Sequence, residues 1–181
     1  RVTPAAEWLL DNYSLIEEQI RIARRDLPKG YSRELPQLSN GASAGYPRVY
    51  AIALELISHV DGRIDANSIR AFVTAYQSVT ALRLGELWAI PIMLRLALLE
   101  NLRRVVVRIA AGRRERELAG QWIDRLHEVA TTAPSEVVLV LAEMVKKNPP
   151  LTVPFITEFA TRMQGGGAAL MFPITWLEHR V

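Results

Sequence analysis

The sequence predicts an all-α fold, and three observations lead to that prediction. Apolar residues recur at spacings of three and four along most of the 181 residues, which is the period of an amphipathic helix. Residues that favour helix starts and ends bracket these runs. No two stretches have the character of strands that could pair. We therefore expect one domain over 1–181, a bundle of seven to eight helices around a long central apolar helix, with a possible subdivision near 112–116.

The first predicted helix covers about residues 4–27. Thr3 can cap it, and Pro4 is pre-organised for the first helical position. This helix would bury one stripe of side chains whose positions are 4, 3, 4, 3 and 4 residues apart. The stripe consists of Leu9, Tyr13, Ile16, Ile20, Ala23 and Leu27. Residues 28–30, with a proline and a glycine, are expected to end it.

Residues 28–46 contain two prolines and three glycines and are predicted to form a loop. Loops of this length in compact domains are commonly functional or disordered. The prolines restrict this one, and its tyrosines can bury their rings while their hydroxyls stay wet, so we expect it to be packed. One of the adjacent residues Arg33 and Glu34 would point inward, toward a carboxylate such as Glu86. The candidate contact residues are Tyr31, Arg33, Glu34, Tyr46 and Arg48. The alternative is that the loop only covers the first two helices.

Pro47 should open a second helix, which Asp61 and Gly62 would end, and Asp65 should cap a short third one. The fourth and longest is expected over Leu84–Ala111. Apolar residues dominate its 87–99 stretch, which predicts a central position. A membrane span would need about 20 such residues and tolerates charge poorly, so we expect none. Pro91 should kink this helix or mark its true start.

Four further helices are expected at about 115–130, 135–147, 152–164 and 168–181. The stretch 137–141 is rich in valine and could be a buried strand, but the residues that follow it favour helix, and helix is the prediction. Gly165–Gly167 should form a hinge or a helix cap. A phosphate-binding loop there would require a preceding strand, and none is predicted.

Charge and composition exclude several classes of site. There are no cysteines, and the net charge of +3 hides an excess of +6 in residues 63–114. Such an excess permits phosphate or membrane binding, but a solvated face or an acidic partner domain explains it as well. No nucleic-acid reader motif accompanies the arginines, so we expect no nucleic-acid partner. The three histidines lie on three different predicted helices with no partner four residues away, which predicts no metal site. Carboxylate pairs such as Glu17 and Glu18 lie beside arginines on a solvated face, which predicts no catalytic residue here. Glu86 is expected to pair with an arginine.

Several stretches of sequence are more specific than composition. They are Pro4–Tyr13, Glu17–Ile20, Asp26–Pro36, Gly45–Tyr50, Gly85–Ile90 and Glu100–Arg104. In this order they resemble the region near the amino terminus of the cyclic β-1,2-glucan synthases, upstream of the glycosyltransferase region. The likeness is strong over roughly residues 4–110. We also expect both ends of the chain to lie within a longer polypeptide.

The resemblance implies a large bacterial inner-membrane enzyme that extends a β-1,2-glucan from UDP-glucose with a divalent metal and then closes it into a ring. This segment has neither an Asp-x-Asp nor a Gln-x-x-Arg-Trp motif, so we expect it to bind no cofactor and to be non-catalytic. Its expected role is docking against other regions of its own polypeptide, on the cytoplasmic side of that membrane. The alternative is a carbohydrate-binding module that holds primer or growing glucan. Docking is preferred because Trp8, Trp88 and Trp122 are expected to face the core.

Overall fold

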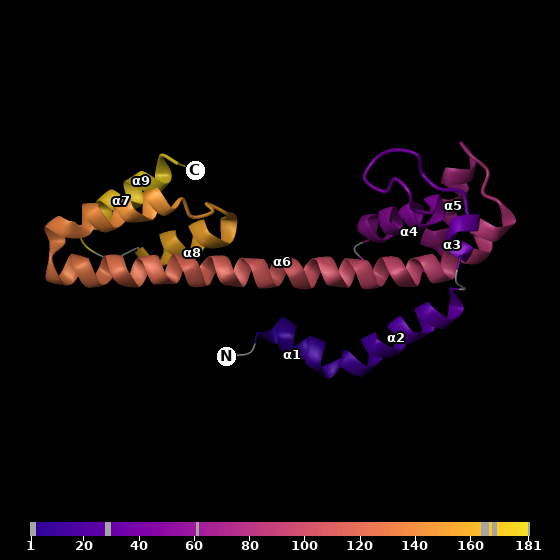
Figure 1. Ribbon diagram of the computed structural model, residues 1–181, viewed down its shortest axis with the longest axis horizontal. Coiled ribbons are helices and arrows are strands. Elements are labelled where there is room, and N and C mark those ends of the chain that lie inside the picture. Colours follow the sequence, from indigo (N-terminus) through magenta and orange to yellow (C-terminus); the bar gives the residue numbers. More distant parts are fainter. Residues whose placement is uncertain (1–2, 28–29, 61, 164–166, 168–169, 181) are drawn as a thin grey trace. The chain divides into compact units, whose positions relative to one another are not determined.

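The computed structural model describes residues 3–27, 30–60, 62–163, 167 and 170–180. Within these ranges all regular elements are helical and no strand is present, which confirms the predicted all-α class (Figure 1). The residues group into two compact units, Arg1–Val105 and Val106–Val181, and each is described by itself. The number of domains stays a prediction.

The first unit contains five helices and the beginning of a sixth. They are α1 (Pro4–Asp11), α2 (Tyr13–Asp26), α3 (Tyr31–Glu34), α4 (Arg48–His59), α5 (Ala66–Gln77) and the first part of α6 (Leu84–Thr132). Thr3 caps α1 as predicted, with its hydroxyl accepting from the amide of Ala6. Asp65 caps α5 as predicted, accepting from the amides of Asn67 and Ser68.

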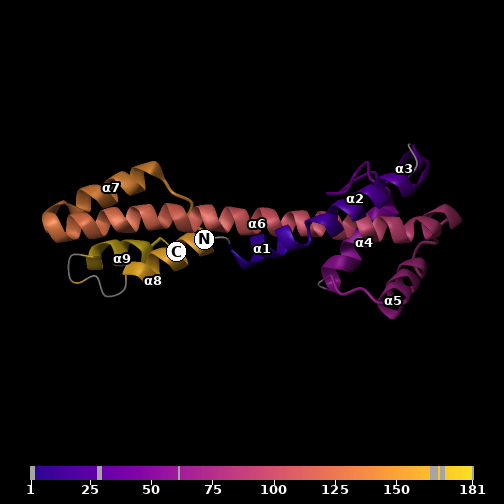
Figure 2. The same cartoon turned by 90° about the horizontal axis from the view of Figure 1, so that it is seen from below.

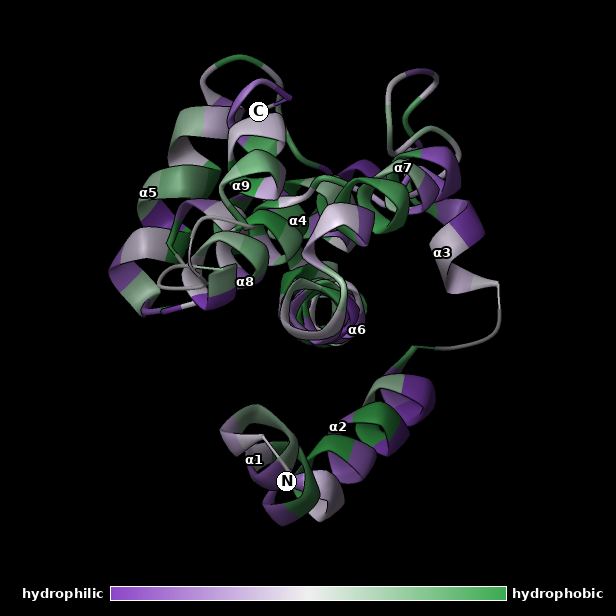
Figure 3. Cartoon of the chain, turned by 90° about the vertical axis from the view of Figure 1, so that its left-hand side faces the viewer, coloured by the Kyte–Doolittle hydropathy of each residue, from purple (hydrophilic) through white to green (hydrophobic). Residues whose placement is uncertain are grey.

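The prediction of a single helix over 4–27 is wrong, because the chain leaves helical geometry at Asn12. The Asn12 backbone has φ −102° and ψ 11°, and its side-chain amide donates to the carbonyl oxygen of Trp8 at 2.8 Å. Asparagine side chains compete in this way with the backbone for local carbonyls. The ribbon of α2 alternates between hydrophobic and hydrophilic residues, as an amphipathic helix requires (Figure 3).

The core of the first unit lies between α4 and α6. Helix α4 buries five apolar side chains against the start of α6, with Ala23 of α2 and Leu35 at the edges. These five are Val49, Ile52, Ala53, Leu56 and Ile57. The face of α6 that meets them includes Ala89, Met93 and Ala97, and it follows the spacing of three to four expected of one helix face.

Helix α6 confirms the long central helix but extends well past the predicted end at Ala111. The helix break expected between Ala111 and Glu115 is absent, since arginine and glutamate are good helix formers and Arg113 pairs with Glu117 one turn ahead. Pro91 lies inside α6 and does not mark its start. The described helices include none with a segment long and apolar enough to cross a membrane.

The second unit contains the rest of α6, a 3-10 turn at Pro134–Glu136, and helices α7 (Val137–Lys147), α8 (Val153–Met163) and α9 (Met171–Glu178). Figures 1 and 2 both show α7 running beside the last part of α6. The 137–141 stretch is helical, as predicted. Gly167 has φ 75°, whereas Gly165, Gly166 and the expected helix start at Ala168 lie outside the described residues.

The nine α-helices of the described residues exceed the predicted seven to eight. The division at Asn12 and the short α3 each add one helix, and the continuity of α6 removes one.

The core of the second unit is apolar and is centred on stacked rings of Phe155 and Phe159, 5.9 Å apart, with Met144 and Leu126 around them.

The Phe155→Ala variant should lose about 3–5 kcal/mol of unfolding free energy, because it removes a fully buried ring and leaves a cavity. Urea titration followed by circular dichroism measures the loss. The matched control is Met171→Ala, which truncates an exposed side chain and should change stability by no more than about 0.5 kcal/mol. Equal stabilities for the two variants would contradict the assigned core.

Candidate functional site

The five candidate residues of the loop region separate into two groups in the structure. Tyr31 and Arg48 both contact the start of α6, where the Tyr31 hydroxyl donates to the carbonyl oxygen of Gly85 at 2.9 Å. Arg33, Glu34 and Tyr46 are exposed. Tyr31 and Arg48 are therefore held by the fold, and the other three side chains are accessible.

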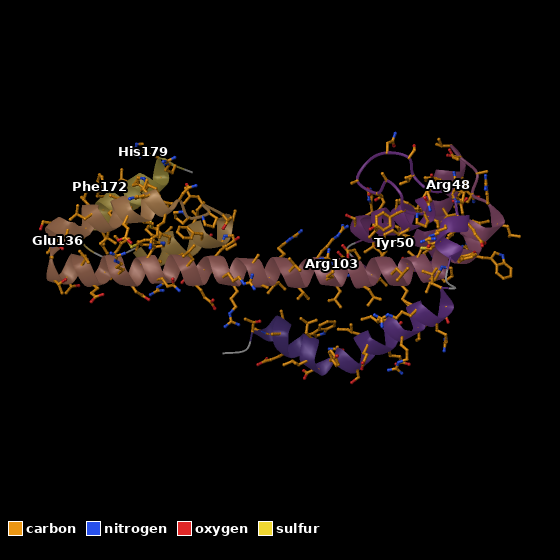
Figure 4. The ribbon with its side chains drawn as sticks, in the orientation of Figure 1. Arg48, Tyr50, Arg103, Glu136, Phe172 and His179 are labelled. Carbon is orange, nitrogen blue, oxygen red and sulfur yellow. The ribbon has the colours of Figure 1, made fainter. Side chains whose placement is uncertain are left out.

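Arg48 and Glu86 form a bidentate ion pair (Figure 4 labels Arg48). Arg48 Nε donates to Glu86 Oε1 and Nη2 to Oε2, each at 2.6 Å, and Nη2 also donates to the carbonyl oxygen of Ala81 at 2.9 Å. The Glu86 side chain has no exposed surface. Such a buried carboxylate is tolerated only when its oxygens are paired and hydrogen-bonded.

The local sequence explains why Glu86 is placed there. Glu86 is the third residue of α6, and its Oε2 accepts from the backbone amide of Arg83, the residue before the helix, at 2.8 Å. A glutamate at this position satisfies an amide that the helix leaves unpaired and suits the positive end of the helix dipole. The predicted pairing of Glu86 with an arginine is confirmed, but the partner is Arg48, while Arg33 in α3 is exposed.

The interactions of this pair keep the Glu86 carboxylate and the Arg48 guanidinium charged. Burial raises the pKa of the Glu86 carboxyl, but hydrogen bonds from Arg48 and from the Arg83 amide outweigh burial and leave the pKa below its usual value. The bond to Glu86 raises the pKa of Arg48. A general acid or base needs a pKa near the working pH, so these two residues are suited to holding the fold and not to transferring protons.

The loop before α4 is attached to the fold by backbone hydrogen bonds. The amide of Leu38 donates to the Tyr46 carbonyl at 3.0 Å, and the amide of Arg48 donates to the Pro36 carbonyl at 2.9 Å. Gln37 and Pro47 form an isolated antiparallel bridge, and Leu35 is buried in the core. The two ends of this loop, at 35–38 and 46–48, are therefore tied to the fold, whereas most residues between 39 and 46 are exposed. The role of the loop as a contact surface stays a prediction.

A polar and aromatic cluster lies beside this loop, and the sequence interpretation did not connect its tyrosines with its charged residues. Tyr46 and Tyr50 place their rings 5.7 Å apart. Glu100 of α6 accepts from Arg103 at 2.7 and 2.9 Å and from Arg104 at 2.9 Å, and these bonds lower its pKa to about 2. Burial raises the pKa of the Tyr50 hydroxyl, and Tyr50 and Arg103 are labelled in Figure 4. The spacing of Glu100 from the two arginines was the available signal.

Two of the three tryptophans expected in the core are exposed, which corrects that prediction. Trp88 is 77% exposed and Trp8 is 52% exposed, whereas Trp122 is only 7% exposed. On α6 the buried face carries Glu86, Ala89 and Met93, so Trp88 falls on the opposite side together with Leu84. Periodicity identified an apolar stripe there but not which of two stripes faces the core.

The described residues contain no group of three or more histidine, cysteine, aspartate or glutamate side chains that could hold a metal ion. The three histidines each have a local partner. His59 lies 3.5 Å from a Glu55 oxygen, while His127 and His179 contact the carbonyl oxygens of Arg162 and Thr175.

Removing one partner of the Arg48–Glu86 pair should be more harmful than removing both. Glu86→Ala leaves the Arg48 guanidinium without its carboxylate and should cost about 3–5 kcal/mol of unfolding free energy. The double variant Arg48→Met with Glu86→Leu should be more stable than Glu86→Ala, because it leaves no charge unpaired. Chemical denaturation of the unsubstituted chain, Arg48→Met, Glu86→Leu and the double variant completes a double-mutant cycle and measures the coupling. Additive losses would show that the two residues do not act as a pair.

Stability should fall as the pH falls from about 4.5 toward 2. The folded-state pKa values of Glu86, Glu100 and Glu143 lie below the unfolded value of 4.5, and those of Glu100 and Glu143 are about 2. The contribution of these carboxylates to the free energy of unfolding is therefore present above pH 4.5 and is lost as they are protonated. Urea midpoints at pH 7, 5, 4 and 3 measure this loss, and Glu100→Gln should flatten the decline. Salt should screen the Glu143 pair, which is more exposed, more than the Glu86 pair. A stability that rises toward pH 3 would contradict the assignment.

No family model matches the chain. Over 180 residues it is 36% identical to the cyclic beta-(1,2)-glucan synthase NdvB of Rhizobium meliloti (strain 1021). The match covers 99% of this chain and 6% of the length of that relative. A match over almost every residue of the chain agrees with the motifs found along it. The chain therefore belongs to the cyclic β-1,2-glucan synthase family, as a segment that corresponds to a small part of such a protein.

Proposed function

We propose that this chain is a non-catalytic helical docking domain of a cyclic β-1,2-glucan synthase, and that it binds other regions of its own polypeptide. The parent protein would polymerise glucose from UDP-glucose with a divalent metal and cyclise the product. The domain would work on the cytoplasmic side of the bacterial inner membrane. These roles rest on the family and on the surface described next.

The observation that carries the docking role is an exposed apolar patch at the start of α6, formed by Leu84 and Trp88. Leu84 and Trp88 are four residues apart and share one helix face. Tryptophan is enriched among the residues that contribute most to protein–protein binding. Apart from the indole N–H, these side chains offer apolar area without hydrogen-bonding groups, which favours a protein partner over a sugar.

This patch is held in place by the ion pair beneath it. Glu86 lies in the same helical turn as Leu84 and Trp88 but on the buried side, where Arg48 fixes it to α4. Tyr31 binds the carbonyl of Gly85 in that turn as well. A surface that is rigid before binding loses less entropy on association, so the arrangement supports docking.

The carbohydrate-binding alternative is favoured by one observation. Tyr46 is exposed beside the Tyr50 ring, near the charged groups of Glu100 and Arg103. An aromatic face next to polar groups is the chemistry that a sugar ring requires. The exposure of Trp8 and Trp88 also removes the earlier reason for discounting this role, so it remains the second candidate.

Replacing Leu84 and Trp88 with serine in the full-length synthase tests docking. The melting temperature of the isolated 1–181 chain should change little, because both side chains are exposed, whereas glucan synthesis per synthase molecule should fall about tenfold, from loss of an interface tryptophan. The matched control is Val153→Ser, an equally exposed apolar residue of the second unit, which should leave synthesis unchanged. Normal synthesis and unaltered protease resistance in the double variant would contradict the docking role.

A further inference from the structure

The second unit contains a pocket that neither the docking surface nor the loop uses. It has a volume of about 520 Å³ and lies where the chain leaves α7 beside α6. Its apolar lining comes from Leu118 and Trp122 of α6 and from Pro149 and Pro150 after α7. The volume falls in the range of roughly 300–1,000 Å³ that is typical of small-ligand sites.

Two cationic side chains lie over the indole ring of Trp122, which is itself largely buried. The Arg125 guanidinium lies 5.8 Å and the Lys147 ammonium 5.5 Å from the ring centroid. Both cations also contact Glu143, whose carboxylate lies 2.6 Å from Arg125 Nη2 and 3.3 Å from Lys147 Nζ. The ring and the carboxylate together fix where these two donors are held.

The polar groups of the pocket include both donors and acceptors. Gln121 and Asn148 each bring an amide that can donate and accept, next to the donors Arg125 and Lys147. Asn148 ends α7 in the left-handed conformation with φ 47°, and the prolines that follow have no amide hydrogen to offer. Because Glu143 offsets one of the two positive charges, the pocket presents directed hydrogen bonds more than a strong positive field.

We propose that this pocket binds a neutral, hydroxyl-rich ring of the pyranose type, with a C–H face against the Leu118 and proline lining and its hydroxyls on Gln121, Asn148, Arg125 and Lys147. Each sugar hydroxyl both donates and accepts, so it matches a rim of mixed character. A small anion would use only the donors and would leave the apolar floor uncovered. The choice of β-1,2-glucan as probe rests on the carbohydrate-binding alternative above. The pocket is a different site from the Tyr46 surface that this alternative names.

Calorimetric titration of the 1–181 chain with short linear β-1,2-glucans tests the pocket. We expect binding in the millimolar range or tighter. Gln121→Ala and Asn148→Gly should each weaken it at least fivefold, and glycine keeps the left-handed backbone at position 148 so that the fold is preserved. Lys146→Ala, which changes an exposed neighbour that does not line the pocket, is the matched control and should bind normally.

Two further arms separate this site from its alternatives. Tyr46→Ala should bind glucan as tightly as the unsubstituted 1–181 chain does. Inorganic phosphate should not displace the bound glucan. Absence of binding by the folded chain would overturn the proposal, as would binding that Tyr46→Ala abolishes while the pocket variants retain it. Displacement by phosphate would replace it with an anion site. None of these results bears on docking, which is read from Leu84 and Trp88 in the other unit.

Discussion

The burial of Glu86 is the constraint on which the first unit depends. A carboxylate with no exposed surface would cost several kcal/mol if it were left unpaired. Its two oxygens accept instead from two guanidinium nitrogens of Arg48 and from the amide of Arg83. These bonds join the first turn of α4 to the first turn of α6. The end of the loop is thereby held against the beginning of α6. The hydrogen bond from Tyr31 to the Gly85 carbonyl holds α3 against the same turn of α6.

The second unit is stabilised in a different way. Its fully buried side chains, among them Phe155, Phe159 and Met144, are apolar. Its charges pair at the surface, as in the contacts of Glu143 with Arg125 and Lys147. Surface pairs of this kind contribute little to stability, so packing dominates there. Those pairs instead hold Arg125 and Lys147 beside Trp122, where the proposed sugar site would use them.

Periodicity and capping residues were sufficient to predict the helical class and the helices α4, α5, α7 and α8. Their limits are physical. The stripe containing Leu84 and Trp88 has the same spacing as the buried stripe of α6, and only tertiary packing decides which one is covered. The pairing of Glu86 with an arginine followed from its position at a helix start, but the choice of Arg48 over Arg33 depends on how the loop folds back. The continuity of α6 past Gly112 shows helix propensity and charge pairing prevailing over one weak residue.

The arginines of the central third illustrate how structure changes the meaning of a charge count. Arg103 and Arg104 share Glu100, while Arg95 and Arg113 find partners outside the 63–114 range, in Asp26 at 3.6 Å and Glu117 at 2.9 Å. An excess of +6 counted along the sequence is therefore partly neutralised in space. Phosphate or nucleic-acid binding would need these guanidinium groups directed at a ligand, whereas here several of them bind carboxylates of the same chain. Recognition by this domain is consequently better sought in Trp88 and its apolar neighbours, and in the mixed polar rim around Trp122, than in its net positive charge.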